Sequence, residues 1–170
     1  VKRILENFSS VKESLMRRKD RKVVESRFKE IILACHCCRL GFNDDGKIYI
    51  VPLNFGYHEE NNKRVFYFHG AAEGRKIELI KKNKYVGFEL DTSYKLITSN
   101  LPCNHSAIYQ SIIGNGKVSF VEDEDEKKLA LRMIMEHSTG KKDWQFTDSM
   151  VSSVCVFKLE VLEISGKENL

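Results

Sequence analysis

Apolar and polar residues alternate along several stretches of the chain, which is the pattern of half-buried β-strands. A short strand is predicted at residues 39–43, and the Asp44-Asp45-Gly46 sequence after it is a strong signal for a tight turn. A long strand follows at 47–57, where Pro52 indicates an edge, a bulge or a ligand-facing gap because it has no amide donor. Further strands are predicted at 64–69, 85–91, 107–121 and 152–164.

Apolar residues at helical spacing predict the helices. A weak helix is expected over the first 20 residues, a second from Val23 to near Cys35, and a short one over 73–82. An amphipathic helix follows the acidic run 122–126, whose carboxylates complement the positive end of the helix dipole.

The order of these elements favours one domain built on an antiparallel sheet. Residues 92–106 contain Pro102 and mixed polar residues, which predicts a longer excursion, and Gly114-Asn115-Gly116 predicts a β-bulge or a close approach of the backbone. Strands outnumber helices and do not alternate with them. A small β-barrel with peripheral helices is therefore expected, because closure removes exposed strand edges.

Composition is that of an ordinary globular protein. Of 170 residues, 42% are apolar and 31% charged, and the net charge is +4. This charge permits an anionic ligand, but without a clustered basic face we expect no nucleic-acid partner. No stretch approaches the roughly 20 apolar residues of a membrane span, and the charged N-terminus does not resemble a signal peptide. We therefore expect no membrane association and a cytoplasmic location.

Three of the five cysteines are crowded into Cys35-His36-Cys37-Cys38. An odd number of cysteines in a chain of this length favours reduced thiols over a disulfide framework. Zinc is an alternative, but its ligands usually form two separated pairs, and Cys103 with His105 makes only a loose second pair. We favour small buried side chains at a helix-to-strand junction and predict no metal.

Residues 66–76 contain the clearest chemical signal. An apolar strand ends at the polar His69, small residues follow, and a helix then begins with Arg75 and Lys76. Small residues allow close approach of the backbone to a ligand, and free amides with two cations attract an anion. The pattern predicts a site for one phosphate group, although an exposed basic helix is the alternative. The segment matches neither the Walker nor the Rossmann glycine motif.

Four motifs occur together in a fixed order: MRRKDR at 16–21, YIVPLNFGY at 49–57, YFHGA with GRK at 67–76, and YQSIIG at 109–114. In this combination the chain resembles the nitroimidazole-resistance (Nim) proteins, within the pyridoxamine 5′-phosphate oxidase-like flavoproteins. The resemblance covers about residues 16–136. It implies a mainly β fold, a six-stranded split β-barrel with peripheral helices over 16–170, preceded by an N-terminal extension at 1–15.

The resemblance also implies a homodimer that binds flavin mononucleotide (FMN) in two equivalent interface clefts. Flavin adenine dinucleotide (FAD) remains possible in the same cleft. Arg75 and Lys76 would hold the phosphate, and His69 would lie beside the flavin. The remaining cofactor-binding residues implied are Pro52, Leu53, Asn54, Phe55, Phe68, Gln110 and Ser111, the last two facing either the cofactor or the second subunit.

A flavin-dependent reductase is the function that the resemblance favours. Electrons would pass from a nicotinamide or protein donor to a small-molecule substrate, a nitroaromatic such as a 5-nitroimidazole. His69 would be the catalytic residue, either donating a proton or holding a structural hydrogen bond. Two alternatives remain open, which are flavin binding without specific turnover and pyridoxamine phosphate oxidation. The second is less favoured because no further basic cluster is evident for a second phosphate.

Overall fold

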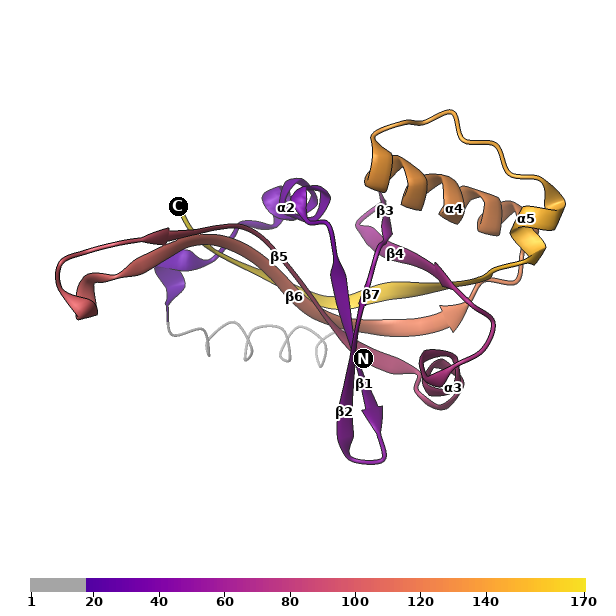
Figure 1. The fold of residues 1–170 in the computed structure, drawn as a ribbon, viewed down its shortest axis with the longest axis horizontal. Helices are drawn as coiled ribbons and strands as arrows, with labels where there is room; N and C mark the ends of the chain where they lie inside the picture. The colour runs from indigo at the N-terminus through magenta and orange to yellow at the C-terminus, as the bar shows by residue number, and fades with distance from the viewer. Residues whose placement is uncertain (1–17) are drawn as a thin grey trace.

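In the computed structural model, which describes residues 18–170, one antiparallel sheet runs through the whole molecule (Figure 1). Its spatial order is β2-β1-β5-β6-β7-β4-β3. The strands are β1 (Cys38–Asp44), β2 (Lys47–Leu53), β3 (Gly56–Glu60), β4 (Lys63–Gly70), β5 (Tyr85–Ile97), β6 (Ser106–Phe120) and β7 (Cys155–Asn169). The predicted mainly β fold is confirmed. The helix expected over the first 20 residues lies almost wholly outside the described residues.

The sheet has seven strands rather than six, because the long strand predicted at 47–57 is two strands. β2 pairs with β1 up to Leu53, and from Gly56 the chain pairs with β4 instead. Asn54 and Phe55 alone connect β2 to β3, which are the two edges of the sheet. Three peptide units span at most about 11 Å, so the two edges must lie close together and the sheet curls into a split barrel. Pro52 lies on the edge strand, where a missing amide donor is tolerated.

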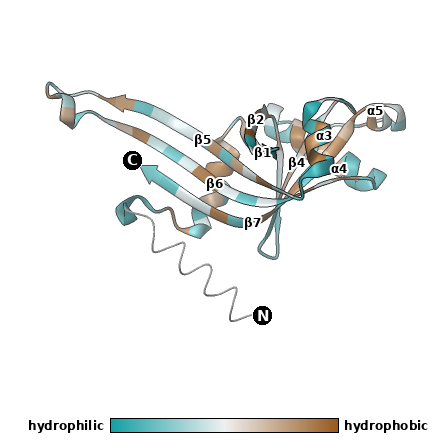
Figure 2. Ribbon diagram, turned by 90° about the horizontal axis from the view of Figure 1, so that it is seen from below, coloured by the Kyte–Doolittle hydropathy of each residue, from teal (hydrophilic) through white to brown (hydrophobic). Residues whose placement is uncertain are grey.

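The β5–β6 hairpin forms an arm that projects beyond the rest of the sheet (Figures 1 and 2). The excursion predicted at 92–106 is wrong, because pairing resumes after a bulge between Thr92 and Lys95 and continues to Ile97 opposite Ser106. β7 leaves the ladder opposite Tyr109, so the end of the arm is only two strands wide. The predicted bulge near Gly116 is confirmed by a shift of register against β7.

Four α-helices flank the sheet in the described part of the chain: α2 (Phe28–Ala34), α3 (Arg75–Lys82), α4 (Glu124–Thr139) and α5 (Asp148–Ser152). Short 3-10 helices lie at Lys19–Arg21, Glu25–Arg27 and Pro102–Asn104. Helix α4 begins where the Asp123 carboxylate accepts a hydrogen bond from the Glu126 amide, and it ends at Gly140, whose φ of 73° is left-handed. Helices α3 and α4 lie on opposite sides of the sheet end formed by β4 and β7 (Figure 1).

Two apolar clusters occupy the two faces of β4, because successive side chains of a strand point in opposite directions. Phe66 and Phe68 belong to the main core inside the barrel, where Phe68 stacks on Phe157 at 5.2 Å. Tyr67 belongs to the smaller core under α4, and its hydroxyl donates to Glu126 of that helix at 3.1 Å. The alternation of this one strand therefore determines which residues face each side.

None of the helices within residues 18–170 combines the length and the apolar character that crossing a membrane requires.

Candidate functional site

The connection from β4 to α3 forms the candidate phosphate site. β4 ends at Gly70, and Gly74 precedes the helix with a φ of 116°, a conformation that a side chain would strain. The Gly74 carbonyl accepts the first helical hydrogen bonds, from the amides of Ile77 and Glu78 at 2.9 and 3.2 Å. The amides of Arg75 and Lys76 thus lie in the first turn, where a helix has no acceptors of its own.

Lys76 is a half-buried cation at this position. A Cβ atom on Gly70 would lie 2.6 Å from the Lys76 ammonium, so the ammonium occupies space left by the missing side chain. The nitrogen also lies 5.5 Å from the centre of the Phe157 ring. Burial lowers the pKa of Lys76, and no hydrogen bond or ion pair joins it to any other residue in 18–170. An anion would supply the missing partner.

Arg75 is exposed and already has an acidic partner. Its guanidinium makes an ion pair with Asp44 at 2.6 Å and lies 4.5 Å above the Tyr49 ring. Both residues belong to the β1–β2 hairpin, so Arg75 joins the start of α3 to that hairpin. Pro52 follows Tyr49 by three residues, about 10 Å along β2. The 52–55 segment therefore begins about 10 Å along the strand from the residue that Arg75 contacts.

The 52–55 segment divides into exposed and buried side chains. Pro52 and Asn54 are exposed and Leu53 is half-buried against the core. Phe55 is fully buried, with its ring 5.5 Å from that of Phe66. Phe68 is buried in the same way. These two phenylalanines can therefore meet a ligand only through their main chain or as the wall behind it.

His69 lies on the other face of β4, next to Tyr67 rather than Gly70. It borders a pocket of about 250 Å³ beneath α4 and α5. The other walls are apolar apart from Ser153: Leu131, Ile134, Met135, Phe146, Met150 and Val154. Burial, and to a smaller extent the charge of Lys76, lower the pKa of His69. This shift favours the neutral imidazole, which has one N–H donor.

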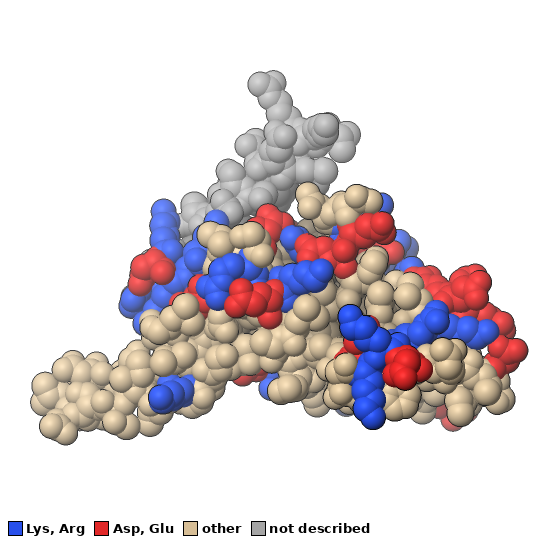
Figure 3. Space-filling view, turned by 90° about the horizontal axis from the view of Figure 1, so that it is seen from above, with Lys and Arg blue, Asp and Glu red and all other residues tan. Residues whose placement is uncertain are grey.

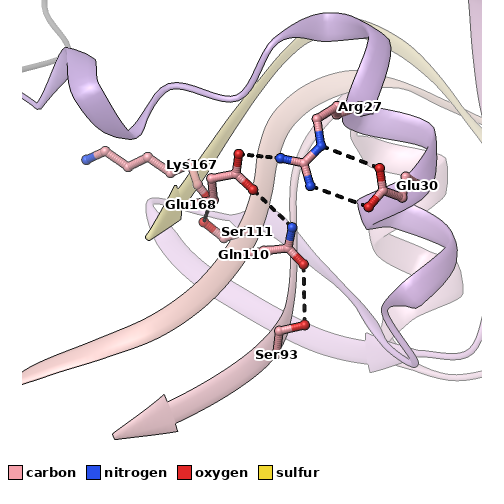
Figure 4. A network of polar contacts seen from close by, with 7 residues as sticks. All are labelled: Arg27, Glu30, Ser93, Gln110, Ser111, Lys167 and Glu168. Atoms are coloured by element: carbon pink, nitrogen blue, oxygen red, sulfur yellow. Dashed lines mark hydrogen bonds and ion pairs between the residues drawn. The ribbon is translucent and has the colours of Figure 1, made fainter. Parts of the chain in front are cut away.

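Gln110 and Ser111 lie in a separate polar network (Figure 4). Hydrogen bonds link its side chains in the order Arg27, Glu168, Gln110 and Ser93. The buried Gln110 amide donates to Glu168 at 3.0 Å and accepts from Ser93 at 3.3 Å. Glu168 also pairs with Arg27 at 2.5 Å. Ser111 donates to the Lys167 carbonyl at 3.4 Å. Both ends of the Gln110 side chain are thus occupied.

The network is distant from His69 within one chain. Gln110 pairs with Glu168 on β7, whereas His69 pairs with Val156. Twelve residues of β7 separate these two positions, which is about 40 Å of extended chain. The structure therefore brings His69, Arg75, Lys76 and the 52–55 segment into one region, but not Gln110 and Ser111.

The cysteine cluster lies at the junction of α2 and β1. Cys35 and Cys38 are buried in the main core, and the Cys35 thiol donates to the Ile31 carbonyl at 3.1 Å. Burial raises the pKa of both thiols, to about 12 for Cys35. All five cysteines are free, and the described residues contain no group of three His, Cys, Asp or Glu side chains placed to bind a metal.

Two features of the site were missed by the sequence analysis. The pairing of Arg75 with Asp44 joins residues 31 positions apart, and Asp44 indicated only a turn. The pocket beside His69 is formed by α4 and α5, which no local motif connects to β4. Trp144, near this pocket in the chain, donates to Thr139 at 3.2 Å.

This fold and site define a class of protein. The model of the pyridoxamine 5′-phosphate oxidase family matches residues 25–168, and the chain belongs to that family. Among solved structures, it is similar to a proposed 5-nitroimidazole antibiotic resistance protein from Bacteroides thetaiotaomicron. The two are 35% identical, the match covers 86% of this chain and 85% of that one, and the TM-score is 0.75.

Two more distant structures share the fold. A flavocytochrome from Azotobacter vinelandii is 18% identical, with a TM-score of 0.74 over 92% of this chain and 72% of that one. An FAD and heme binding protein from Mycobacterium smegmatis is 12% identical, with a TM-score of 0.72 over 88% and 73%. A search of curated proteins found no match.

Proposed function

We propose that the protein is a flavin-dependent reductase that holds the phosphate of FMN at the start of α3. The observation that carries this proposal is the half-buried Lys76 ammonium, which has no acidic partner among the described residues and lies in the space beside Gly70. Family membership and the 35% identity to the Bacteroides protein support it.

A phosphate fits the chemistry of this position. A dianion beside Lys76 would favour the charged ammonium that burial disfavours, and the first amides of α3 would add hydrogen bonds. Arg75 would contribute a second charge while Asp44 and Tyr49 hold its guanidinium in place. The backbone of residues 52–55 offers hydrogen-bonding groups for the flavin ring.

Bound flavin supplies the electron-transfer chemistry, with a nicotinamide or protein donor and a small nitroaromatic acceptor. The protein would position the flavin, and His69 would exchange a proton with the acceptor. Part of the lowered pKa of His69 comes from the charge of Lys76. Phosphate binding at Lys76 would offset that charge and move the pKa of His69 back toward 6.5, nearer to that of an effective proton donor.

We also propose that the protein acts as a homodimer. Gln110 and Ser111 are about 40 Å from His69 along one chain, so a single flavin would meet both groups only if a second copy supplies one of them. The arm favours the same conclusion, because a two-stranded ribbon alone is marginally stable in water. Figure 3 shows the arm as an almost uncharged projection. Its exposed apolar residues are Tyr94, Leu96, Ile97 and Leu101. A cytoplasmic location is consistent with five free thiols.

The first experiment measures flavin retention. Purified protein should carry a yellow cofactor that denaturation releases and mass spectrometry identifies as FMN or FAD. Lys76→Met removes the charge at nearly constant length and should abolish retention. Lys81→Met is the matched control, because Lys81 lies on the same helix but is exposed and paired with Glu78. Equal flavin content in wild type and Lys76→Met would refute the phosphate assignment.

The second experiment measures turnover. Flavin-loaded protein is mixed with NADH or NADPH and a 5-nitroimidazole, and the loss of nitro absorbance is followed. Wild type should reduce the acceptor, and His69→Ala should retain flavin but lose rate. Flavin retention without turnover for any donor would leave a flavin-binding protein rather than a reductase.

A further inference from the structure

The pocket beside His69 has the size of a small aromatic ring. Its volume is about 250 Å³, and an engineered cavity of about 150 Å³ lined by aliphatic and aromatic side chains binds benzene. The pocket is open to solvent on one side, so a single substituted ring would fit inside it, whereas a whole flavin or nicotinamide dinucleotide would extend out of it.

The lining of the pocket selects against charge. Six apolar side chains from α4, α5 and the segments around them form most of the wall, and no Lys, Arg, Asp or Glu is among the lining residues. A charged ligand would lose its hydration without gaining an ion pair. His69 is the polar ring at the border and, when neutral, donates one hydrogen bond.

The outer wall of the pocket is held in place by several hydrogen bonds. The Thr147 hydroxyl caps α5, accepting from the Met150 amide, and Asp148 pairs with Lys128 of α4 at 2.8 Å. Ser153 donates to the Met150 carbonyl at 2.8 Å. The Lys128–Asp148 pair joins α5 to α4, and the other two bonds hold the turn of α5 itself, so this wall of the pocket is shaped by contacts within the chain.

We propose that this pocket binds a small uncharged aromatic molecule that carries a hydrogen-bond acceptor, which His69 recognises. Binding requires no flavin, because the pocket and the Lys76 site lie on opposite faces of β4. Only the interpretation of the occupant as the electron acceptor rests on the proposed reductase function.

Methionine methyl groups provide a direct test. Of the four methionines, Met135 and Met150 line the pocket, whereas Met133 on the same helix faces Gly56 of β3 and serves as an internal reference. The full chain is labelled with ¹³C at the methionine methyls and titrated with nitrobenzene, toluene or benzoate. We expect saturable shifts at Met135 and Met150 with nitrobenzene and toluene, little change at Met133, and none with benzoate.

Two adjacent serines give a matched pair of variants. Ser152 and Ser153 are both exposed and both donate to a backbone carbonyl three residues earlier, but only Ser153 lines the pocket. Ser153→Phe should abolish nitrobenzene binding, and Ser152→Phe should not. His69→Phe should weaken nitrobenzene binding about two- to tenfold, the effect of one lost hydrogen bond, and leave toluene affinity unchanged.

The outcomes separate this proposal from the flavin proposal. Shifts that do not saturate, equal effects of the two serine variants, or tight benzoate binding would overturn the pocket. Lys76→Met should keep nitrobenzene binding while losing flavin. If the wild-type protein binds no flavin, the reductase proposal is refuted and the pocket proposal stands. If it binds flavin but no nitrobenzene, the pocket proposal is refuted and the flavin proposal stands.

Discussion

Replacing Gly70 by alanine should weaken flavin binding while leaving the fold intact. The added Cβ would lie 2.6 Å from the Lys76 ammonium and 3.4 Å from its Cε atom. Normal contact needs about 3.5 Å, so the ammonium must move by about 1 Å. The φ of Gly70 is not positive, so alanine can adopt its backbone conformation. The group that must move is the end of a flexible side chain, and we expect the free energy of unfolding to change by less than about 1 kcal/mol.

The loss of affinity follows from the geometry of one hydrogen bond. A charge-assisted bond to phosphate needs about 2.7–2.9 Å, and a displacement of about 1 Å breaks it. The cost is about 1.5–3 kcal/mol, or about 10- to 150-fold in the dissociation constant for FMN. Quenching of FMN fluorescence on titration with flavin-free protein measures this constant, and thermal unfolding checks the fold.

Two further variants make the test of Gly70→Ala decisive. Gly41→Ala in β1 is the control, because its Cβ would meet nothing closer than the Gly87 carbonyl at 3.9 Å, and FMN affinity should not change. Gly70→Ala combined with Lys76→Met should bind no worse than Lys76→Met alone, since both act through the same ammonium. An unchanged dissociation constant for Gly70→Ala, or additive losses in the double variant, would refute the reasoning.

Three other predictions concern stability and assembly. Tyr67→Phe removes the hydrogen bond to Glu126 and should cost about 1 kcal/mol in chemical denaturation; no loss would mean that this bond does not fasten α4. Burial lowers the pKa of His137 below 6.5, so its contribution to stability is full above pH 6.5 and is lost as the pH falls through the folded-state pKa. The free energy of unfolding should therefore fall as the pH is lowered below about 6.5, and His137→Asn should reduce that fall. Tyr94→Ser with Leu96→Ser should convert the proposed dimer to a monomer in light scattering, and a monomeric wild type would contradict the role of the arm.

The sequence predicted the start of a helix correctly where residues close to that start determine it. Gly74 followed by two cations predicted the start of α3, which the structure places at Arg75. The acidic run before α4 predicted its first turn, where Glu124, Asp125 and Glu126 lie. In each case the hydrogen bonds that start the helix join near neighbours, from the Ile77 amide to Gly74 and from the Glu126 amide to Asp123, so a short window of sequence contains the cause.

Errors occurred where pairing between distant segments decides the structure. The alternation of 47–57 is continuous, and only the change of partner from β1 to β4 breaks it at Asn54 and Phe55. The polar residues after Ile164 did not indicate a strand, yet β7 continues to Asn169 because Glu168 is paired with Gln110 and Arg27. Those partners lie 58 and 141 positions away in the sequence.

The candidate site shows the same division between local and distant causes. The sequence placed His69, Arg75 and Lys76 in one short segment, and it treated them as one site. The structure keeps these residues close together but directs His69 and the Lys76 ammonium to different faces of β4, because His69 and Gly70 are neighbours on the strand. The Lys76 ammonium lies on the α3 side of β4, and the His69 imidazole borders the apolar pocket under α4. A cofactor and an uncharged aromatic can thus be recognised by adjacent residues of β4 without competing for the same space.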